Sequence, residues 1–392
     1  MRFNQFHDSY WIKTSLKDVA KKINAKNKNK FCKNVISNSA QHGLIRQIDY
    51  FDKEIAQNES IENYTIINKD DFVYNPRKSI EAPYGPVNIY NFDETGIVSP
   101  LYLCFSIQNI NKKFLHYYFK SKAWHRFVYL YGDSGARHDR VSIKDEVFFS
   151  QQLSIPTSSD EIEKITDLLF QVEQRINTQS KIIEDLESLE KTLNDTIFDQ
   201  LVKSQKLYRF SNIYQEAKEG GTPDTSHFEY YNNGAIPFIK IDDITNKHLT
   251  RNNCFITELG MNKSSAWLIP TNSILYSNGA TIGSVTITTY PVSTKQGILG
   301  IVPQQDVLTE YLYYLLKSKY FKKEICKITT QGTMKSAYIK DIDQILIPQL
   351  EKSEQNDIIK KLQLITLKIQ KEKDMLDLYK KHKAYLLQNM FI

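Results

Sequence analysis

Two copies of one long heptad pattern constrain the fold of this chain more than any other feature. After residue 353, side chains of the second copy recur at alternating steps of four and three, at Ile358, Leu362, Ile365, Ile369, Leu376, Tyr379, Leu386 and Met390. This spacing places one apolar stripe along a helix and is typical of helices that pack against another helix. Glu372 and Lys383 are the two polar interruptions of the stripe. Because no Pro or Gly follows Pro348, the segment is predicted to be one continuous helix.

The same stripe occurs earlier in the chain, displaced by 193 positions, as from Ile358 to Ile165. The earlier copy consists of Ile165, Leu169, Val172, Ile176, Gln179, Ile183, Leu186, Glu190, Leu193 and Ile197. Its own polar interruptions, Gln179 and Glu190, fall where the later copy has Glu372 and Lys383. The pattern therefore predicts two long amphipathic helices whose apolar stripes form a helix–helix interface.

Each stripe follows a globular region, and the ends of the two regions also match. Residues 311–319 repeat residues 114–122 at an offset of 197, and the Ile-Pro pair at 347–348 repeats that at 155–156 at an offset of 192. Offsets that change only outside the helices are typical of a tandem duplication with small insertions in loops. The sequence predicts an α+β chain with a domain at 1–157, a helix at 158–203, a domain at 204–350 and a helix at 351–392. The two domains diverge before their final elements, which favours one task performed on two targets.

Composition narrows the class of protein. The 392 residues are enough for two domains with sizeable cores, and the net charge of +6 suits a polyanionic partner. The four cysteines show no CxxC spacing, which favours a reducing compartment and no zinc site. The N-terminal stretch has no apolar signal-like core, and no apolar run has membrane-spanning length. We therefore expect a soluble, cytoplasmic protein with no membrane contact.

Basic and amide side chains gather in predicted loops and at predicted strand ends, for example in the predicted strand and turn at 236–244 and inside the predicted hairpin at 273–287. The candidates for DNA contact are Asn75, Arg77, Lys78, Arg137, Arg140, Lys240, Asn278, Lys295, Gln296 and Lys335. Arg, Lys, Asn and Gln can form paired hydrogen bonds with base edges, and basic loops contact phosphates. The alternative for each is an ordinary solvated loop side chain. A basic, Asn-rich stretch at 26–33 and a polar, Gly-containing stretch at 132–140 are also predicted to be loops, and residues 114–124 are predicted to be helical.

Motifs of catalysis are missing from the sequence. The Gly-containing segment at 279–284 lacks the lysine of a phosphate-binding loop. The stretch 75–77, Asn-Pro-Arg, has only the first half of the Asn-Pro-Pro-aromatic signature of amino-methyltransferases. The Pro-Asp pair at 223–224 is not followed by the carboxylate and lysine of a metal-dependent nuclease, and the histidines show no metal-ligand spacing. These absences predict a binding protein with no catalytic residues, no metal and no cofactor of its own.

Several stretches together resemble the specificity subunit of a type I restriction-modification system. In the second half they are Gly-Gly-Thr-Pro-Asp at 220–224, Ile-Pro-Phe-Ile-Lys at 236–240, the helix entry at 347–358 and the closing residues 386–392. In the first half they are residues 74–77, 96–102 and 135–137. The motifs occur in the order typical of the family and are duplicated, which makes the resemblance specific. Together they cover the whole chain.

The resemblance implies a function and a set of partners. Members of this family have no active site, and each of their two target-recognition domains, of mixed α/β structure, reads one half of a bipartite site on double-stranded DNA. The two long helices form an antiparallel coiled coil that separates the domains and docks two methylation subunits. Those subunits bind S-adenosylmethionine, and restriction subunits that use ATP and Mg²⁺ join the complex. Two other hypotheses remain: a coiled-coil scaffold whose domains bind protein, and a nuclease or methylase fused to its own specificity module.

Overall fold

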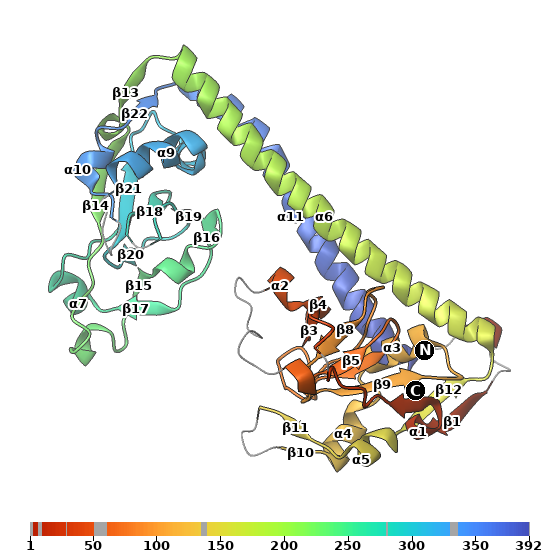
Figure 1. Ribbon diagram of the computed structural model, residues 1–392. Helices are drawn as coiled ribbons and strands as arrows, with labels where there is room; N and C mark the ends of the chain where they lie inside the picture. The colour runs from red at the N-terminus through yellow and green to blue at the C-terminus, as the bar shows by residue number, and fades with distance from the viewer. Residues whose placement is uncertain are drawn as a thin grey trace. The chain divides into compact units, whose positions relative to one another are not determined.

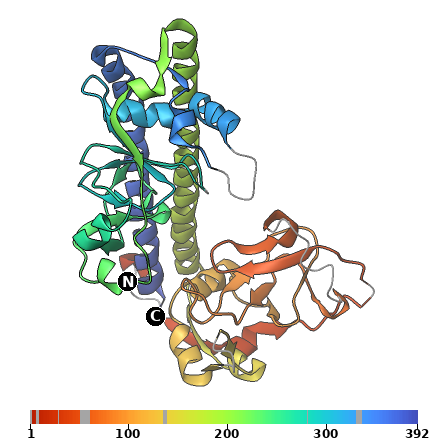
Figure 2. The same ribbon diagram turned by 90° about the vertical axis from the view of Figure 1, so that its left-hand side faces the viewer.

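The computed structural model describes residues 3–6, 10–28, 30–50, 61–134, 139–279, 281–329 and 336–391 (Figures 1 and 2). The chain forms two compact units, one of Met1–Ser180 with Asp374–Ile392 and one of Lys181–Lys373. Each unit therefore combines one globular region with a part of each of two long helices.

The two long helices are α6 (Ser159–Ser204) and α11 (Lys352–Met390), with 46 and 39 residues. At 1.5 Å per residue they extend for about 69 Å and about 58 Å. The Ser158 hydroxyl accepts a hydrogen bond from the Glu161 backbone N–H at 3.3 Å, which supplies a partner for one of the free donors at the start of α6. The two helices predicted from the heptad pattern are thus confirmed.

Within both units α6 and α11 run antiparallel (Figure 1). In the first unit Glu173 of α6 pairs with Lys383 of α11 at 2.5 Å. In the second unit Glu187 pairs with Lys373 at 2.6 Å, and Glu190 accepts a hydrogen bond from Thr366. The partner's number falls as the residue number on α6 rises, which is the signature of antiparallel helices.

The predicted stripes lie on the inner side of the helices. The buried members are Ile165, Leu169, Val172, Ile183, Ile358, Leu362, Ile369, Leu386 and Met390. The partly buried members are Ile176, Leu186, Leu193, Ile197, Ile365, Leu376 and Tyr379. Fully burying one such side chain stabilises the fold by about 1.5–3 kcal/mol. In each unit the stripe merges with the core of the globular region.

Short strands and helices build the globular region of the first unit. Its strands are β1 (Trp11–Ser15), β2 (Ala20–Lys22), β3 (Val35–Ser39), β4 (Gly43–Arg46), β5 (Thr65–Ile67), β6 (Phe72–Tyr74), β7 (Val87–Ile89), β8 (Gly96–Val98), β9 (Leu103–Ile107), β10 (Asp133–Ser134), β11 (Val141–Ser142) and β12 (Gln152–Pro156). Its helices are α1 (Leu16–Val19), α2 (Gln47–Tyr50), α3 (Lys112–Lys120), α4 (His125–Tyr131) and α5 (Asp145–Phe149). One four-stranded sheet has the order β2-β9-β6-β7 and another the order β4-β3-β8-β5. Only the β3–β8 pairing within these two sheets is parallel.

Aromatic side chains fill the core between the first of these sheets and the helices. Phe72 of β6 stacks on Phe105 of β9, with ring centroids 5.5 Å apart. Tyr74 stacks on Phe148 of α5 at 4.9 Å and meets Trp124 edge-on at 6.1 Å. Such rings each remove a large apolar area from water, so this core holds β6 and its following turn in place.

The second unit has a different sheet arrangement. Its strands are β13 (Leu207–Arg209), β14 (Tyr214–Glu219), β15 (Ile236–Ile239), β16 (His248–Leu249), β17 (Cys254–Ile256), β18 (Ile274–Ser277), β19 (Val285–Thr288), β20 (Ser293–Thr294), β21 (Ile298–Pro303) and β22 (Leu346–Pro348). Its helices are α7 (Glu258–Asn262), α8 (Thr309–Lys317), α9 (Lys319–Ile328) and α10 (Ile339–Ile342). A five-stranded sheet has the order β14-β21-β18-β19-β16, and a three-stranded sheet has the order β17-β15-β20. The predicted hairpin is present as the antiparallel pair β18–β19.

The elements next to the long helices are common to both units. The strand before each long helix ends in Ile-Pro and pairs antiparallel with an early strand of its unit, β12 with β1 and β22 with β13. The matching stretches 114–122 and 311–319 lie on α3 and α8 and the residues that follow them. The predicted tandem duplication is therefore confirmed at the level of the fold.

Two local predictions need correction. We expected helix from Phe114 to Trp124, but α3 ends at Lys120, and a new helix starts at His125. The hydroxyl of Ser121 accepts a hydrogen bond from the Ala123 N–H at 3.1 Å and so closes a turn between the two helices. The predicted loop at 132–140 contains strand β10, which pairs with β11 just beyond it; residues 135–138 lie outside the described residues.

Candidate nucleic-acid interface

In the first unit, the candidate surface starts at the turn that follows β6. The Asn75 amide donates to the Asn38 carbonyl at 3.0 Å, and its oxygen accepts from the Arg77 N–H at 3.0 Å. The Asn75 N–H donates to the Pro86 carbonyl at 3.0 Å. A side chain at Gly85, which has a φ of +82°, would reach within 2.1 Å of the Asn75 carbonyl, so this close approach requires glycine. Asn75 therefore shapes the turn, and Arg77 is exposed beyond it.

Arg140 lies opposite Arg77, although the two are far apart in sequence. The two residues form an antiparallel bridge. The Lys78 N–H donates to the Asp139 carbonyl at 2.8 Å, and the Val141 N–H donates to the Pro76 carbonyl at 2.9 Å. This pairing concentrates positive charge on one short two-stranded segment. Arg137 lies outside the described residues.

A hollow of about 350 Å³ opens beside this pair. It is lined by Ser37, Asn38, Ser39, Ile45, Asn75, Pro76, Arg77, Ser99, Leu101, Tyr102 and Arg140. Burial raises the pKa of Tyr102, while the charges of Arg140 and Arg77 act in the opposite direction. Three of the predicted residues therefore share one concave surface with hydroxyl and amide groups, which suits hydrogen bonding to a polar ligand.

In the second unit, two parallel strands bring the candidate lysines together. Phe238 of β15 is in register with Ser293 of β20, and Ile239 with Thr294. Lys240 and Lys295 follow directly, so they lie next to each other at the same edge, and the Lys295 N–H donates to the Ile239 carbonyl at 3.1 Å. The neighbouring Cys254 side chain raises the pKa of Lys240.

The turn of the Gly-Gly-Thr-Pro motif packs against this edge. A side chain at Gly220 would come within 2.2 Å of the Thr294 hydroxyl, so only glycine fits. The Gln296 N–H donates to the Thr222 hydroxyl at 3.3 Å, and Gln296 itself is exposed. The motif thus shapes the loop that presents Lys295 and Gln296.

Asn278 has a different environment from the other candidates. Its side chain is only 4% exposed, and its amide donates to the Ala337 carbonyl at 3.1 Å. The Ala337 N–H returns a hydrogen bond to the Asn278 carbonyl at 3.0 Å. A buried, bonded amide holds two segments together, so we assign Asn278 a supporting place beneath the surface. Lys335 lies outside the described residues.

Sequence reasoning missed several residues that share these surfaces. Tyr102 and Asn38 line the hollow of the first unit, and Thr222 supports the edge of the second. A neighbouring hollow of about 400 Å³ in the first unit is lined in part by Lys22 and Lys26. Lys26 begins the basic, Asn-rich stretch, and Tyr102 and Thr222 lie in the stretches 96–102 and 220–224 that carry the family resemblance, whereas Asn38 and Lys22 carried no sequence signal.

Within the described ranges, no group of three or more His, Cys, Asp or Glu side chains is arranged to hold a metal ion. None of the helices in the described part of the chain combines the length and the apolar character needed to cross a bilayer.

The second surface lies inside a stretch that matches a known family. Residues 206–377 match the model of the type I restriction modification DNA specificity domain. The match covers less than half of the chain, so it is a likeness of this stretch to that domain. Lys240, Lys295 and Gln296 all lie within the matched stretch, as does the start of α11.

A curated specificity subunit resembles part of the chain as well. The chain is 32% identical over 183 residues to the specificity subunit of the type I restriction enzyme MjaIX from Methanocaldococcus jannaschii. That alignment covers 45% of this chain and 41% of the relative, so the chain spans about two fifths of the curated relative's length.

Solved structures resemble nearly the whole chain. One, described as the structural basis of complex assembly and conformational transition of the type I R-M system, has a TM-score of 0.65, 15% identity and 96% coverage of both chains. The HsdS subunit from Thermoanaerobacter tengcongensis has a TM-score of 0.51 and 16% identity, and the likeness covers 96% of this chain and 95% of that one. At this level of identity, the likeness shows that the chain shares its fold with these structures.

Proposed function

We propose that the chain is the DNA sequence-specificity subunit of a type I restriction-modification complex. Residues 206–377 resemble the type I restriction modification DNA specificity domain, whose role is DNA sequence recognition. The observation that carries the proposal is the presence of one basic surface in each unit of a duplicated frame, Arg77 with Arg140 in the first and Lys240 with Lys295 in the second. Each unit would read one half of a bipartite DNA site.

The proposed mode of recognition combines charge with hydrogen bonding. An arginine can bond both acceptors of a guanine edge in the major groove, and lysines contact phosphates or the same acceptors. The pair of long helices would set the gap between the half-sites. Helices of about 60 Å are long enough to hold two readers over successive major grooves, which recur every ~34 Å.

We further infer that partner subunits carry the chemistry. In this proposal two methylation subunits dock on the helices and bind S-adenosylmethionine, and restriction subunits use ATP and Mg²⁺. Purified chain incubated with DNA, Mg²⁺, ATP and S-adenosylmethionine should therefore transfer no methyl group and cut no DNA. Product above that of a mock preparation would contradict the inference.

The decisive experiment exchanges residues 204–350 for the same region of a relative. Sequencing of the modified DNA should then show one new half-site, while the other half-site and the spacer stay the same. The reciprocal exchange of residues 1–157 is the matched control and should change the opposite half-site. A swap that scrambles both half-sites would contradict two independent readers. Binding to duplex DNA that is insensitive to salt would favour a protein-binding scaffold instead, because phosphate contacts release counterions.

A further inference from the structure

A tyrosine of the first unit connects its globular region to a polar step in the helix pair. The Tyr117 hydroxyl, on α3, donates to one carboxylate oxygen of Glu173 on α6 at 3.0 Å. The other oxygen accepts from the Lys383 ammonium of α11 at 2.5 Å. The Glu173 and Lys383 side chains are 29% and 22% exposed. Burial alone would raise the pKa of Glu173, but the Lys383 charge and the hydrogen bonds from Lys383 and Tyr117 hold it below its usual value.

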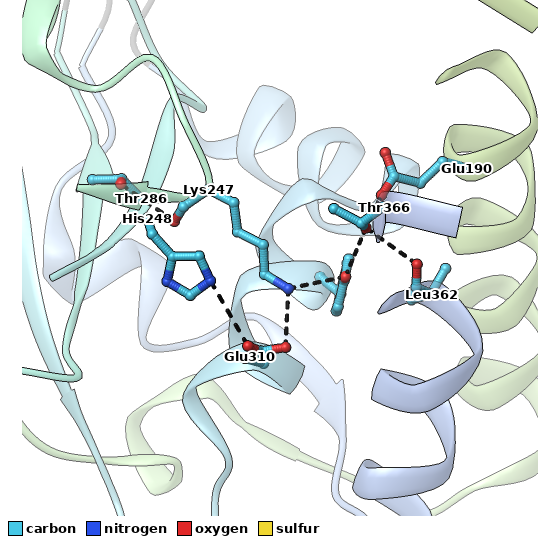
Figure 3. Close-up of polar contacts among 8 residues, drawn as sticks. Glu190, Lys247, His248, Thr286, Glu310, Leu362 and Thr366 are labelled. Carbon is cyan, nitrogen blue, oxygen red and sulfur yellow. Dashed lines mark hydrogen bonds and ion pairs between the residues drawn. The ribbon is translucent and has the colours of Figure 1, made fainter. Parts of the chain in front are cut away.

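The second unit contains an equivalent connection with different side chains (Figure 3). The Tyr314 hydroxyl, on α8, is 3.2 Å from the Thr366 hydroxyl on α11. Thr366 in turn donates to the Glu190 carboxylate on α6. The order is the same in both units: a tyrosine of the globular region, a residue of one long helix, and a residue of the other.

The three positions are the ones that the duplication relates. Tyr314 lies 197 positions after Tyr117, which is the offset of the α3 and α8 stretches. Thr366 lies 193 positions after Glu173, which is the offset of the helical stripes. Glu190 and Lys383, also 193 apart, are corresponding polar interruptions, one in each stripe. Between the long helices, the first unit has the Glu173–Lys383 ion pair, and the second has the Thr366–Glu190 hydrogen bond at the corresponding positions. The place of the polar contact is therefore the same in both units, but its chemistry differs.

Hydrogen bonds continue from α3 toward the candidate surface of the first unit. The Lys120 ammonium, one turn after Tyr117, donates to the Asn88 side-chain oxygen at 2.6 Å. The Asn88 amide donates to the Asn38 side chain at 2.5 Å. Asn38 in turn lines the hollow, and its carbonyl accepts from Asn75. A run of polar contacts thus joins α3 to the turn that presents Arg77.

In the second unit the corresponding run leads to the five-stranded sheet. The Lys247 ammonium donates to the Tyr314 hydroxyl at 3.0 Å and to Glu310 at 2.9 Å. The Lys247 carbonyl accepts from the Ile287 N–H of β19 at 2.8 Å. Figure 3 shows Lys247 between Glu310 and the helix that carries Thr366.

We propose that Tyr117 and Tyr314 are positioning residues that fix each recognition region at one angle and one register on the helix pair. An apolar stripe alone tolerates small shifts along and around a helix, whereas a partly buried polar contact is satisfied in only one register. The inference rests on the proposed function, because the fixed geometry would select the spacer between the two half-sites.

The test measures spacer selectivity in the full chain. Affinity is compared for duplexes that carry both half-sites with the natural spacer, with one base pair more or less, and with one half-site alone. Tyr117→Phe and Tyr314→Phe should each reduce the preference for the natural spacer about tenfold, the equivalent of one lost hydrogen bond to a polar network. Binding to a single half-site should stay within about twofold of the unmodified protein, since no surface residue is altered.

Tyr311→Phe is the matched control. Tyr311 is buried on the same helix as Tyr314, and its hydroxyl donates to the Pro348 carbonyl at 2.9 Å, away from the polar step. The first unit carries Phe114 at the equivalent position. Tyr311→Phe should keep the spacer preference. An equal loss in this control, or a uniform fall in all affinities that follows the melting temperature, would overturn the inference.

Transferring the polar pair of the second unit into the first distinguishes an effect on positioning from a general loss of stability. Lys383→Glu alone would place two carboxylates together and should lose spacer selectivity. Adding Glu173→Thr imports the hydroxyl–carboxylate pair of the second unit and should restore selectivity. Failure of restoration in a folded double variant would overturn the inference. Absence of any sequence preference in the unmodified protein would overturn the proposed function and this inference together, whereas a preference that none of the variants changes would overturn this inference only.

Discussion

The two units use the same elements against the long helices and different elements at their candidate surfaces. In the first unit, Arg77 and Arg140 meet on a short antiparallel bridge beyond β6. In the second, Lys240 and Lys295 follow two parallel strands. The helix pair accepts only one shape of neighbour, which constrains α3 and α8 together with the Ile-Pro strands. The far side of each region does not pack against the helices, and under the proposed function it would vary with the DNA target.

A second difference lies beside the shared tyrosines. His116 precedes Tyr117 in the first unit, whereas Tyr313 precedes Tyr314 in the second. The Nδ1 atom of His116 is buried with no hydrogen-bond partner among the described residues. Burial, together with the charges of Lys120 and Lys383, lowers the pKa of His116 to about 4, although Glu173 acts in the opposite direction. The first unit therefore contains an acid-sensitive position at a place where the second has a tyrosine.

The largest expected effect tests whether the two units depend equally on the shared stripe. Ile183 and Leu169 are buried on α6, in the second and first unit respectively. Ile183→Asp and Leu169→Asp should each destabilise the protein by roughly 3–5 kcal/mol, because apolar burial is lost and an unpaired carboxylate is buried. Chemical denaturation measures the loss. Glu184→Asp, next to Ile183 but exposed, should be nearly silent, and equal stability of all three variants would contradict the heptad assignment.

The helices were predictable from sequence because their signal is local and repeated. A stripe with steps of three and four needs no knowledge of distant segments, and its recurrence at one offset identifies the duplication. The start of α6 also has a local cause, because the Ser158 hydroxyl accepts a hydrogen bond from the Glu161 N–H. The end of α3 was not predictable, because Lys120 and Trp124 lie in one continuous helix-like stretch and only the turn at Ser121 separates them.

The residues of the candidate surfaces could be named from the sequence, but which of them lie next to each other could not. The residues around Arg77 do not predict that Arg140 lies beside it, because the bridge between the two depends on backbone pairing between distant segments. Lys240 and Lys295 meet through a parallel strand pair, which no turn signal marks. The burial of Asn278 depends on the distant residue Ala337, and a hydrogen-bonded core amide looks the same in sequence as an exposed one.

The next expected effect uses pH to tell the units apart. The unfolded chain takes up a proton at His116 as the pH falls through the ordinary value of 6.5, but the folded chain does so only near pH 4. The stability contributed by the neutral ring is therefore full above pH 6.5 and declines toward pH 4, by about 2 kcal/mol for a partly exposed ring. His116→Gln should flatten the stability profile in this window.

Thermal unfolding at pH 7 and pH 5 gives the comparison. Tyr313→Phe, at the equivalent position of the second unit, should leave the pH dependence as it is. Glu173 does not confuse the result, because its lowered pKa makes its stabilising contribution constant above the ordinary 4.5 and confines the pH dependence of that contribution to lower pH. A pH profile of His116→Gln that coincides with that of the unmodified protein would show that the ring is solvated.

The smallest expected effect separates the two surfaces by single side chains. Lys295→Ala should weaken DNA binding by ~1–3 kcal/mol if the lysine reads a base, with selectivity lost in one half-site only. Arg77→Ala should do the same for the other half-site. Lys327→Ala is the control, since Lys327 is exposed on α9 and pairs with Glu324 at 2.6 Å. Affinities for duplexes altered in one half-site at a time measure each effect.

If Lys295 or Arg77 contacts only phosphate, its removal would weaken binding to all sequences alike and reduce the salt dependence by about one ion. That result would identify a contact that positions the DNA and does not read a base. Loss of selectivity in both half-sites from one substitution would contradict the assignment of one surface to each unit.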